Sequence, residues 1–458
     1  MISLRCSDIT EILNGSLHGD DATVTSVSTD SRSISAGELF IALKGPNFDG
    51  TAFVAEVKAK GAIAVVTEQQ VSEAISQIVV KDTRLALGQL AAAVKARLAP
   101  KTIAVTGSAG KTTVKEMMAA ILSRRGQVLS TQGNFNNDIG VPLTMLRLTE
   151  KHNYAVLELG ANHQGEIAYT TSLAKPDVAI ITNVAASHLE GFGDVYGVAR
   201  AKGEIFNGLS ASGLAILPAD SEYRDYWLKR LEGKTVMQFS ATGPADYYAE
   251  GIVLDNEGCA GFELICPTGR QFIQLTIPGR HNVANALAAA AACIAVGATL
   301  TDVQLGLAQM QAVKGRTNVK MVNPQLRLID DSYNANVESV KAAIDLLASY
   351  SGYRVLVFGD MGELGADARL YHEEIGLYAK KSGINLLFTL GVLSQSASDL
   401  FNGQGAHFSS RQALLQRLLP IVSEQQEVTL LVKGSRSAKM ELVVQDLLER
   451  CQQENSPC

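Results

Sequence analysis

The segment Thr106-Gly-Ser-Ala-Gly-Lys-Thr-Thr113 constrains the fold of this 458-residue chain more than any other. It follows the β-branched run 102–106 and precedes apolar residues at helical spacing, so it joins a predicted strand to a predicted helix. In that context a glycine-rich loop presents main-chain N–H groups to phosphate. The full phosphate-loop pattern has a further glycine at position 105, where this chain has Val105. The sequence predicts an ATP or GTP site in an α/β domain, with a helix-capping glycine turn as the alternative.

Each residue type in this loop suits one part of a nucleotide. Gly107 and Gly110 let the main chain approach the anion, and Lys111 brings a positive charge to the outer phosphates. Thr112 offers a hydroxyl group to magnesium. The predicted nucleotide contacts in this loop are Gly107, Ser108, Ala109, Gly110, Lys111, Thr112 and Thr113.

Three polar residues beyond the loop are candidates for the same site. Glu158 ends an apolar run that predicts a strand, where its carboxylate would complete a magnesium site with Thr112 or serve as a structural ion-pair partner. His188 also follows a predicted strand and suits a metal ligand or a hydrogen-bond donor, although a single histidine is more often structural. Lys202, taken alone, indicates a cation on a helix surface.

The order of predicted strands and helices divides the chain into three α/β domains. Residues 1–99 form a small N-terminal domain. Residues 100–314 form a central domain with a parallel sheet and a small antiparallel addition at 246–278. Residues 315–458 form a second open sheet that starts near Leu326, and the last few residues are expected to fray. Expected elements include strands at 24–27, 39–43, 62–66, 154–159, 178–182, 354–358, 386–390 and 428–432, helices near 52–60, 84–98 and 284–296, and a linker at 313–318.

The composition excludes several classes of protein. A net charge of −6 provides no basic surface for wrapping a nucleic acid. The six cysteines have neither metal-site spacing nor the density of a disulfide framework, which favours a reducing compartment. No apolar run reaches the length of a membrane span, and the N-terminus lacks a signal-peptide pattern. We therefore expect a cytoplasmic protein, and a monomer.

Several motifs occur together in the order typical of one family. They are the loop at 106–113, Gly133-Asn-Phe-Asn-Asn-Asp-Ile-Gly-Val-Pro142, Glu158-Leu-Gly-Ala, Ser187-His-Leu-Glu-Gly, Pro278-Gly-Arg-His-Asn-Val-Ala-Asn285, Gly315-Arg316 and Asp330-Asp-Ser-Tyr-Asn-Ala-Asn336. In these motifs the chain resembles the Mur ligases over nearly its whole length. The stretches Leu43-Lys-Gly, Gly359-Asp-Met-Gly-Glu-Leu-Gly365 and Lys433-Gly-Ser-Arg-Ser437 make it most similar to the members that add D-alanyl-D-alanine, and it lacks the Asp-Asn-Pro-Arg motif of the third-residue ligases.

The resemblance implies a role for each domain: an N-terminal domain for the UDP precursor, a central ATPase domain and a C-terminal Rossmann-like domain. It implies precursor contacts at Ser31, Arg32, Lys44, Gly45, Phe48, Asp49 and Asn137, the alternative for the N-terminal group being a polar loop. It also implies nucleotide contacts at Asn282, Asn285, Arg316, Asp331 and Tyr333.

The same resemblance implies that His188 contacts a second magnesium ion and that Lys202 carries CO2 as a carbamate. Lys111, His188 and Lys202 are then the predicted catalytic residues, and Thr112, Glu158, His188 and carbamylated Lys202 the predicted magnesium ligands. The implied reaction uses ATP to activate the carboxylate of UDP-N-acetylmuramoyl-tripeptide as an acyl phosphate, which D-alanyl-D-alanine attacks. The alternatives are a related amide ligase with another acceptor, such as a folylpolyglutamate synthetase, and a phosphate-loop nucleotide switch. The third residue of the tripeptide, diaminopimelate or lysine, stays open.

Overall fold

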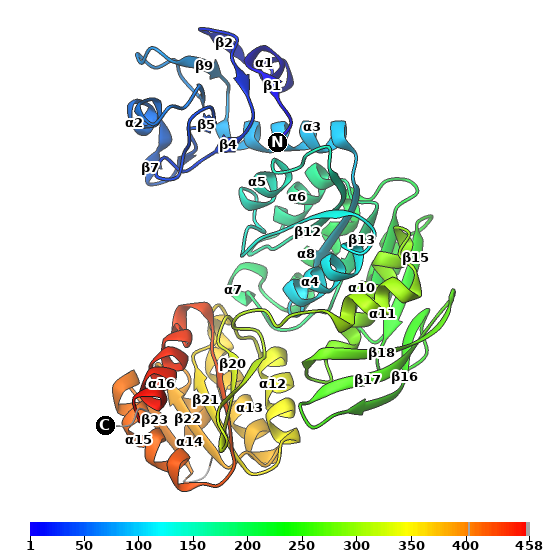
Figure 1. Ribbon diagram of the computed structural model, residues 1–458, viewed down its shortest axis with the longest axis vertical. Helices are drawn as coiled ribbons and strands as arrows, with labels where there is room; N and C mark the ends of the chain where they lie inside the picture. The colour runs from blue at the N-terminus through cyan, green and yellow to red at the C-terminus, as the bar shows by residue number, and fades with distance from the viewer. Residues whose placement is uncertain (402–403, 455–458) are drawn as a thin grey trace.

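The computed structural model describes residues 1–401 and 404–454, which form three α/β domains stacked along the long axis of the molecule (Figure 1). The expected fraying of the last few residues falls mostly outside the described residues. No helix in the described part of the chain combines the length and apolar character that a membrane span requires.

The N-terminal domain is built on a five-stranded sheet of order β2-β9-β8-β5-β4, in which only β2 is antiparallel to its neighbour. The predicted strand at 24–27 is wrong, because the chain turns within it and its two ends enter different sheets. The elements are β1 Leu4–Arg5, α1 Cys6–Leu13, β2 Ser16–His18, β3 Thr23–Val24, β4 Val27–Ser28, β5 Leu39–Ile41, β6 Lys44–Gly45, β7 Phe48–Asp49, α2 Val54–Ala59, β8 Ala64–Thr67 and β9 Ser76–Val79.

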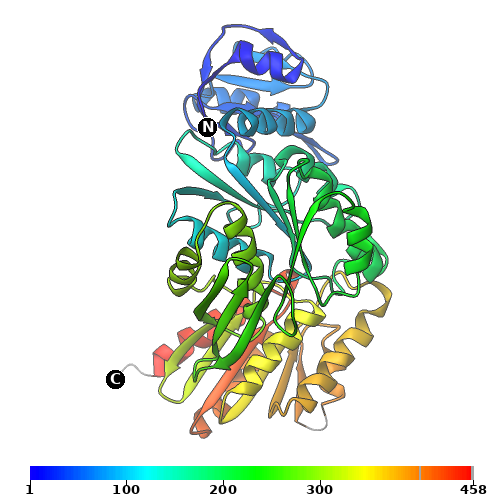
Figure 2. The same cartoon turned by 90° about the vertical axis from the view of Figure 1, so that its right-hand side faces the viewer.

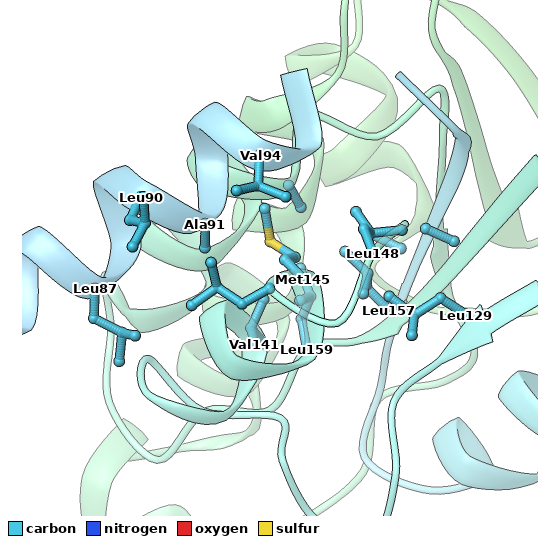
Figure 3. Packing of buried hydrophobic residues seen from close by; sticks show 14 of the residues in the cluster. Leu87, Leu90, Ala91, Val94, Leu129, Val141, Met145, Leu148, Leu157 and Leu159 are labelled. Carbon is cyan, nitrogen blue, oxygen red and sulfur yellow. The ribbon is translucent and has the colours of Figure 1, made fainter. Parts of the chain in front are cut away.

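Helix α3 (Thr83–Leu98) joins this domain to the central one. The side chain of Asp82 caps its N-terminus by accepting a hydrogen bond from the Leu85 N–H at 2.8 Å. Leu87, Leu90 and Val94 project from α3 onto Val141 and Met145 of the central domain (Figure 3). A single buried apolar cluster therefore runs through both domains.

The central sheet has the order β11-β12-β10-β13-β14-β15-β16-β17-β18. It is parallel from β11 to β16 and antiparallel from there on, as expected for the addition at 246–278. Its strands are β10 Lys101–Thr106, β11 Gln127–Ser130, β12 His152–Glu158, β13 Val178–Ile181, β14 Leu214–Pro218, β15 Thr235–Ser240, β16 Tyr247–Leu254, β17 Cys259–Cys266 and β18 Gly269–Pro278. Its helices are α4 Lys111–Leu122, α5 Gly140–Met145, α6 Glu166–Ala174, α7 Leu189–Phe192, α8 Val195–Gly203, α9 Arg224–Arg230, α10 Asn282–Ala295 and α11 Leu300–Ala308.

The C-terminal sheet has the order β19-β20-β24-β21-β22-β23, with only β19 antiparallel. The sheet starts earlier than the predicted Leu326, because the edge strand β19 precedes β20. Its strands are β19 Asn318–Asn323, β20 Leu326–Asp331, β21 Tyr353–Gly359, β22 Leu386–Leu390, β23 Gly405–Phe408 and β24 Val428–Lys433. Its helices are α12 Val337–Ser349, α13 Ala368–Lys381, α14 Gln395–Asp399, α15 Arg411–Glu424 and α16 Glu441–Glu454.

The antiparallel part of the central sheet reaches the C-terminal domain beside α12 (Figure 2). The hydroxyl group of Tyr350, just after α12, donates a hydrogen bond at 2.6 Å to the main-chain oxygen of Glu257 in the β16–β17 turn. The two domains are therefore in contact far from the glycine loop as well as at it.

Candidate active site

The loop 107–110 connects β10 to α4 at the carboxyl end of the central parallel strands, where open α/β sheets bind their ligands. Gly107 and Gly110 have φ angles of +151° and +79°. A Cβ atom on Gly107 would lie 1.9 Å from Oγ1 of Thr182, and one on Gly110 would lie 2.5 Å from Oδ1 of Asn285. Both positions therefore require glycine for space as well as for conformation.

The segment that follows β13 fixes the shape of the loop. The Ala109 N–H donates to Oδ1 of Asn183 at 2.8 Å, and the Thr182 hydroxyl group donates to the Ala109 oxygen at 2.6 Å. The Ser187 hydroxyl group donates to Oγ of Ser108 at 3.0 Å. The loop is thus preorganised by the strand next to its own.

Lys111, the first residue of α4, folds its side chain back over the loop. Its Nζ donates to the Gly107 oxygen at 2.6 Å. Burial lowers the pKa of Lys111, while the nearby carboxylate of Glu158 acts in the opposite direction. A phosphate group at the loop would stabilise the charged amine, so the geometry agrees with the predicted contact to the outer phosphates.

Thr112 and Glu158 meet beside the loop, as predicted. The Thr112 hydroxyl group donates to Oε2 of Glu158 at 3.0 Å, and the Asn136 amide donates to Oε1 at 2.9 Å. The Glu158 main-chain N–H donates to Oγ1 of Thr131 at 3.0 Å. This arrangement brings together the hard oxygen donors that magnesium prefers. Nothing in the local sequence distinguishes Asn136 from the other asparagines of its loop as the partner of Glu158.

Asn137, the predicted precursor contact, has a structural role in this arrangement. Its Oδ1 accepts a hydrogen bond from the Gly140 N–H at 2.8 Å and its main-chain oxygen accepts one from Val141 at 2.9 Å, which caps α5.

A buried lysine supports the strand that carries Glu158. The side chain of Lys115 is 2% exposed, its Nζ donates to the Thr131 oxygen at 2.6 Å, and it pairs with Glu116 at 2.5 Å. Because Thr131 also bonds the Glu158 main chain, Lys115 is connected to the main chain of Glu158 through one intermediate residue.

His188 and Lys202 both lie beside the ring of Phe192. The rings of His188 and Phe192 meet edge to face at 6.3 Å between centroids, and Nζ of Lys202 lies 5.4 Å from the Phe192 centroid. His188 contacts a residue that we had not predicted, since its Nδ1 pairs with a carboxylate oxygen of Glu363 in the C-terminal domain.

Lys202 is not the surface cation that its helix alone indicated, because its side chain is only 1% exposed. Burial, followed by repulsion from Lys111, lowers the pKa of Lys202 to about 7, against the attraction of Glu166, Glu204 and Glu158. Lys202 therefore has a neutral amine in a large fraction of molecules near pH 7, and this is the form that can act as a nucleophile.

A cleft of about 50 Å³ separates the loop from the C-terminal domain, and Arg316 and Asn336 lie in its wall. The Asn336 amide crosses the cleft and donates to the Ser108 oxygen at 3.1 Å. The guanidinium group of Arg316 stacks on the Tyr333 ring with 4.3 Å between Cζ and the ring centroid. These residues stand where a nucleotide on the loop would meet the second domain.

Asp331 is buried behind this wall rather than exposed in it. Its carboxylate pairs with the buried Nζ of Lys433 and accepts a hydrogen bond from the Thr317 N–H at 3.1 Å. Lys433 also donates to the Asn334 oxygen at 3.1 Å. Asp331 and Lys433 thus hold the main chain at Thr317 and Asn334, the residues that follow Arg316 and Tyr333. The motif of Lys433 did not reveal this function.

Asn282 and Asn285 lie at the start of α10 and are both buried. The Asn285 amide donates to Oδ1 of Asn282 at 2.9 Å, and the Asn282 amide donates to the Pro278 oxygen at 2.8 Å. Asn285 also contacts the loop at Gly110. The pair is therefore positioned beside the phosphate loop.

The predicted precursor contacts of the N-terminal domain follow adjacent parallel strands. Ser31 and Arg32 come after β4, and Lys44, Gly45, Phe48 and Asp49 come after β5. Arg32 forms a bidentate pair with Asp30 at 2.7 and 2.9 Å, and Lys44 lies 4.0 Å from Glu68. A cavity of about 140 Å³ beside them is lined by Ala42, Lys44, Asp49, Thr51, Glu68, Gln69, Gln70 and Val71.

Comparison with known proteins accounts for this combination of loop, carboxylate and buried lysine. Family models match residues 23–95 (Mur ligase family, catalytic domain), 105–293 (Mur ligase middle domain) and 315–436 (Mur ligase, glutamate ligase domain). The UDP-N-acetylmuramoyl-tripeptide--D-alanyl-D-alanine ligase of Escherichia coli strain K12 is 50% identical over 100% of both chains. The chain belongs to the Mur ligase family.

Solved Mur ligase structures show the same fold. MurF from Acinetobacter baumannii has a TM-score of 0.94 and 38% identity, covering 98% of this chain and 99% of that one. MurF ligase from Thermotoga maritima in complex with ADP has a TM-score of 0.84 and 26% identity, covering 94% and 98%. The predicted family and three-domain α/β fold are confirmed for this Mur ligase.

Proposed function

We propose that this Mur ligase uses ATP to join D-alanyl-D-alanine to the terminal carboxylate of UDP-N-acetylmuramoyl-tripeptide, giving the pentapeptide precursor of peptidoglycan, ADP and phosphate. The observation that carries the proposal is the 50% identity, over the entire chain, to a UDP-N-acetylmuramoyl-tripeptide--D-alanyl-D-alanine ligase. The site supports it, because a phosphate loop, a magnesium-type carboxylate and a buried lysine meet beside a second domain.

The reaction follows from the positions of the side chains. Lys111 and the loop N–H groups offset the charge on the γ-phosphoryl group while it passes from ATP to the precursor carboxylate. The amine of D-alanyl-D-alanine then attacks the carbonyl carbon of the acyl phosphate, loses a proton, and the phosphate group leaves. Arg316 and Asn336 close the nucleotide cleft from the C-terminal domain, which keeps water from the acyl phosphate.

The residues present fit magnesium. Thr112 and Glu158 would hold one ion and His188 a second, and the ions would neutralise charge on the phosphoryl oxygens. Within the described residues no three His, Cys, Asp or Glu side chains form a metal site, so water, substrates or a modified residue would supply the remaining oxygen ligands.

A carbamate on Lys202 would supply such oxygens. The neutral amine of Lys202 attacks CO2, a C–N bond forms and one proton is released, which converts a cation into an anionic oxygen donor. The buried position of the side chain and its pKa of about 7 support this step. Mass spectrometry of the intact protein in bicarbonate buffer, with Lys202→Met as the control, would measure the added CO2.

The remaining assignments stay proposals. We propose domain boundaries at 99/100 and 314/315, which fall between the segments 23–95, 105–293 and 315–436 that the family models match. Lys44 and Asp49 are proposed to bind the UDP precursor because they line the cavity formed by 42–51 and 68–71. Ser31, Arg32, Gly45 and Phe48 are proposed with them because they follow the adjacent parallel strands β4 and β5. The cytoplasmic location and the monomer are predictions of the same kind, and the third peptide residue, diaminopimelate or lysine, stays open.

The deciding experiment measures phosphate release from ATP with UDP-N-acetylmuramoyl-tripeptide, comparing D-alanyl-D-alanine, single amino acids and no acceptor. Turnover that requires both the tripeptide and the dipeptide is expected. A requirement for a different acid and amine would keep the ligase chemistry and refute the cell-wall step. Release without any acceptor would favour a nucleotide switch.

A further inference from the structure

Glu363 belongs to the C-terminal domain, but its side chain contacts the central domain. Its carboxylate pairs with Nδ1 of His188, and its main-chain oxygen accepts a hydrogen bond from the Glu190 N–H at 3.4 Å. Both partners lie at the start of α7, so Glu363 bridges two domains at the edge of the proposed catalytic site. The reaction described above leaves this residue without a role.

The main chain holds Glu363 in an unusual conformation. Its φ angle of +62° lies in the left-handed region, which is costly for any residue other than glycine and is retained mostly at functional sites. Neighbouring bonds fix the loop: the Met361 N–H donates to Nε2 of His372 at 2.9 Å, and the Asp360 carboxylate accepts from Val392 and Ser394 at 2.9 and 2.8 Å. These hydrogen bonds hold the loop so that the Glu363 carboxylate lies across the domain interface.

The contact determines which nitrogen of His188 is available. Because an anionic carboxylate lies against Nδ1, a proton on Nδ1 is favoured, which leaves the lone pair of Nε2 for another ligand. Histidines that bind metals in proteins commonly donate their other ring N–H to a carboxylate, which fixes the tautomer and the orientation of the ring. Here that carboxylate comes from a different domain.

We propose that Glu363 is a positioning residue that acts through His188, so that the second cation site is completed only when the C-terminal domain docks. The inference rests on the proposed function in one respect, the role of His188 as a cation ligand. Since docking orients the imidazole ring and the cation holds it, docking and cation binding should strengthen each other.

The test measures Mn²⁺ binding to the full chain in the presence of ADP, using electron paramagnetic resonance to count free Mn²⁺. Glu363→Gly removes the carboxylate and suits the positive φ angle, so the loop should keep its fold. We expect this variant to weaken the weaker Mn²⁺ site about 10-fold to 100-fold. Glu363→Gln should recover most of the affinity, because its amide oxygen can lie beside Nδ1 in place of the carboxylate oxygen.

Glu338→Gln is the matched control. The Glu338 side chain is 58% exposed, close to the 54% of Glu363, and it pairs with Lys341 on its own helix rather than across the domains. Its Mn²⁺ affinity should equal that of the wild type. An unchanged affinity in Glu363→Gly would overturn the proposal.

Combining the substitution with His188→Ala separates the possible failures. If Glu363 acts through the imidazole, Glu363→Gly has no further effect on Mn²⁺ affinity in the His188→Ala background. An equal loss in both backgrounds would mean that Glu363 acts directly, which refutes the proposal. If His188→Ala alone leaves the affinity unchanged, the cation role of His188 fails and the positioning role with it. The binding assay needs neither precursor nor acceptor, so a wrong acceptor in the ligase assay would leave it intact.

Discussion

The side-chain amide of Asn336 donates a hydrogen bond to the main-chain oxygen of Ser108, 228 positions earlier in the chain, at 3.1 Å. Asn336 also caps α12, since its Oδ1 accepts from the Ser339 N–H at 2.8 Å. One side chain thus ends a helix of the C-terminal domain and contacts the phosphate loop of the central domain. The two functions can be separated, because a shorter side chain can cap the helix without crossing the cleft.

Asn336→Ser should keep the cap and lose the contact to Ser108. A neutral hydrogen bond contributes about 0.5–1.5 kcal/mol, so we expect the KM for ATP to rise roughly 2-fold to 10-fold while the thermal midpoint stays near the wild type. Asn336→Ala should lose the cap as well, which lowers stability by about 1 kcal/mol. Steady-state kinetics and calorimetry check both values. An unchanged KM in Asn336→Ser would show that the contact is unimportant for nucleotide binding.

Lys111→Ala should lower turnover at saturating ATP and magnesium by at least about 100-fold, because the transferring phosphoryl group loses its nearest positive side chain. Lys101→Ala is the control, since Lys101 is exposed at the opposite end of β10. Both proteins should have wild-type circular dichroism spectra. Turnover near the wild-type rate in Lys111→Ala would refute the assignment of the loop.

The buried amine of Lys202 should make stability depend on pH. Burial lowers the folded-state pKa of Lys202 to about 7, while the pKa in the unfolded chain stays near the ordinary lysine value of 10.5. Between these values the unfolded state binds more protons, so the contribution of Lys202 to the free energy of unfolding increases with pH. Below pH 7 both states are protonated and the penalty for burying the charge is complete.

Urea unfolding in bicarbonate-free buffer measures this effect, taken as the difference between the wild type and Lys202→Met. From pH 8 to pH 9 the free energy of unfolding of the wild type should increase relative to that of Lys202→Met by about 1.4 kcal/mol per pH unit, the slope for one proton. A difference that is flat over this interval would mean that the amine titrates as in the unfolded chain.

Lys115→Met should lower the free energy of unfolding by about 1–3 kcal/mol. The methionine side chain fills a similar volume but leaves the buried Thr131 oxygen without its donor. Glu116→Gln, which removes the charge of the more exposed partner, should cost less than about 1 kcal/mol. Urea titrations of the two variants show which substitution costs more free energy of unfolding. A larger loss in Glu116→Gln would show that the contact of Lys115 with Thr131 is weaker than its pairing with Glu116.

Local pattern was enough to predict much of this structure. The apolar runs before Gly107 and Glu158 predicted two neighbouring strands, and a parallel sheet brings their carboxyl ends together, so Thr112 and Glu158 meet as expected. The predicted antiparallel addition at 246–278 contains the β17–β18 hairpin, whose two-residue connection leaves little choice of pairing.

Contacts between domains could not be predicted in this way. Nothing in the local sequence of Glu363 indicates that His188, in another domain, is its partner. Lys202 looked like a surface residue because helical periodicity does not reveal what packs over a helix; burial comes from the tertiary fold. Strand β19 was missed because it is a half-exposed edge strand without a continuous apolar run.

The hydrogen bond from Tyr350 to Glu257 gives the C-terminal domain a second point of attachment, remote from the phosphate loop. A body held at one end can admit a nucleotide at the other by tilting, with no need to detach. In that geometry the C-terminal domain would rotate about the Tyr350 contact. The contacts made by Asn336 and Glu363 would then form when the domain closes. Removing the Tyr350 hydrogen bond would then impair domain closure without altering any group that touches the substrates.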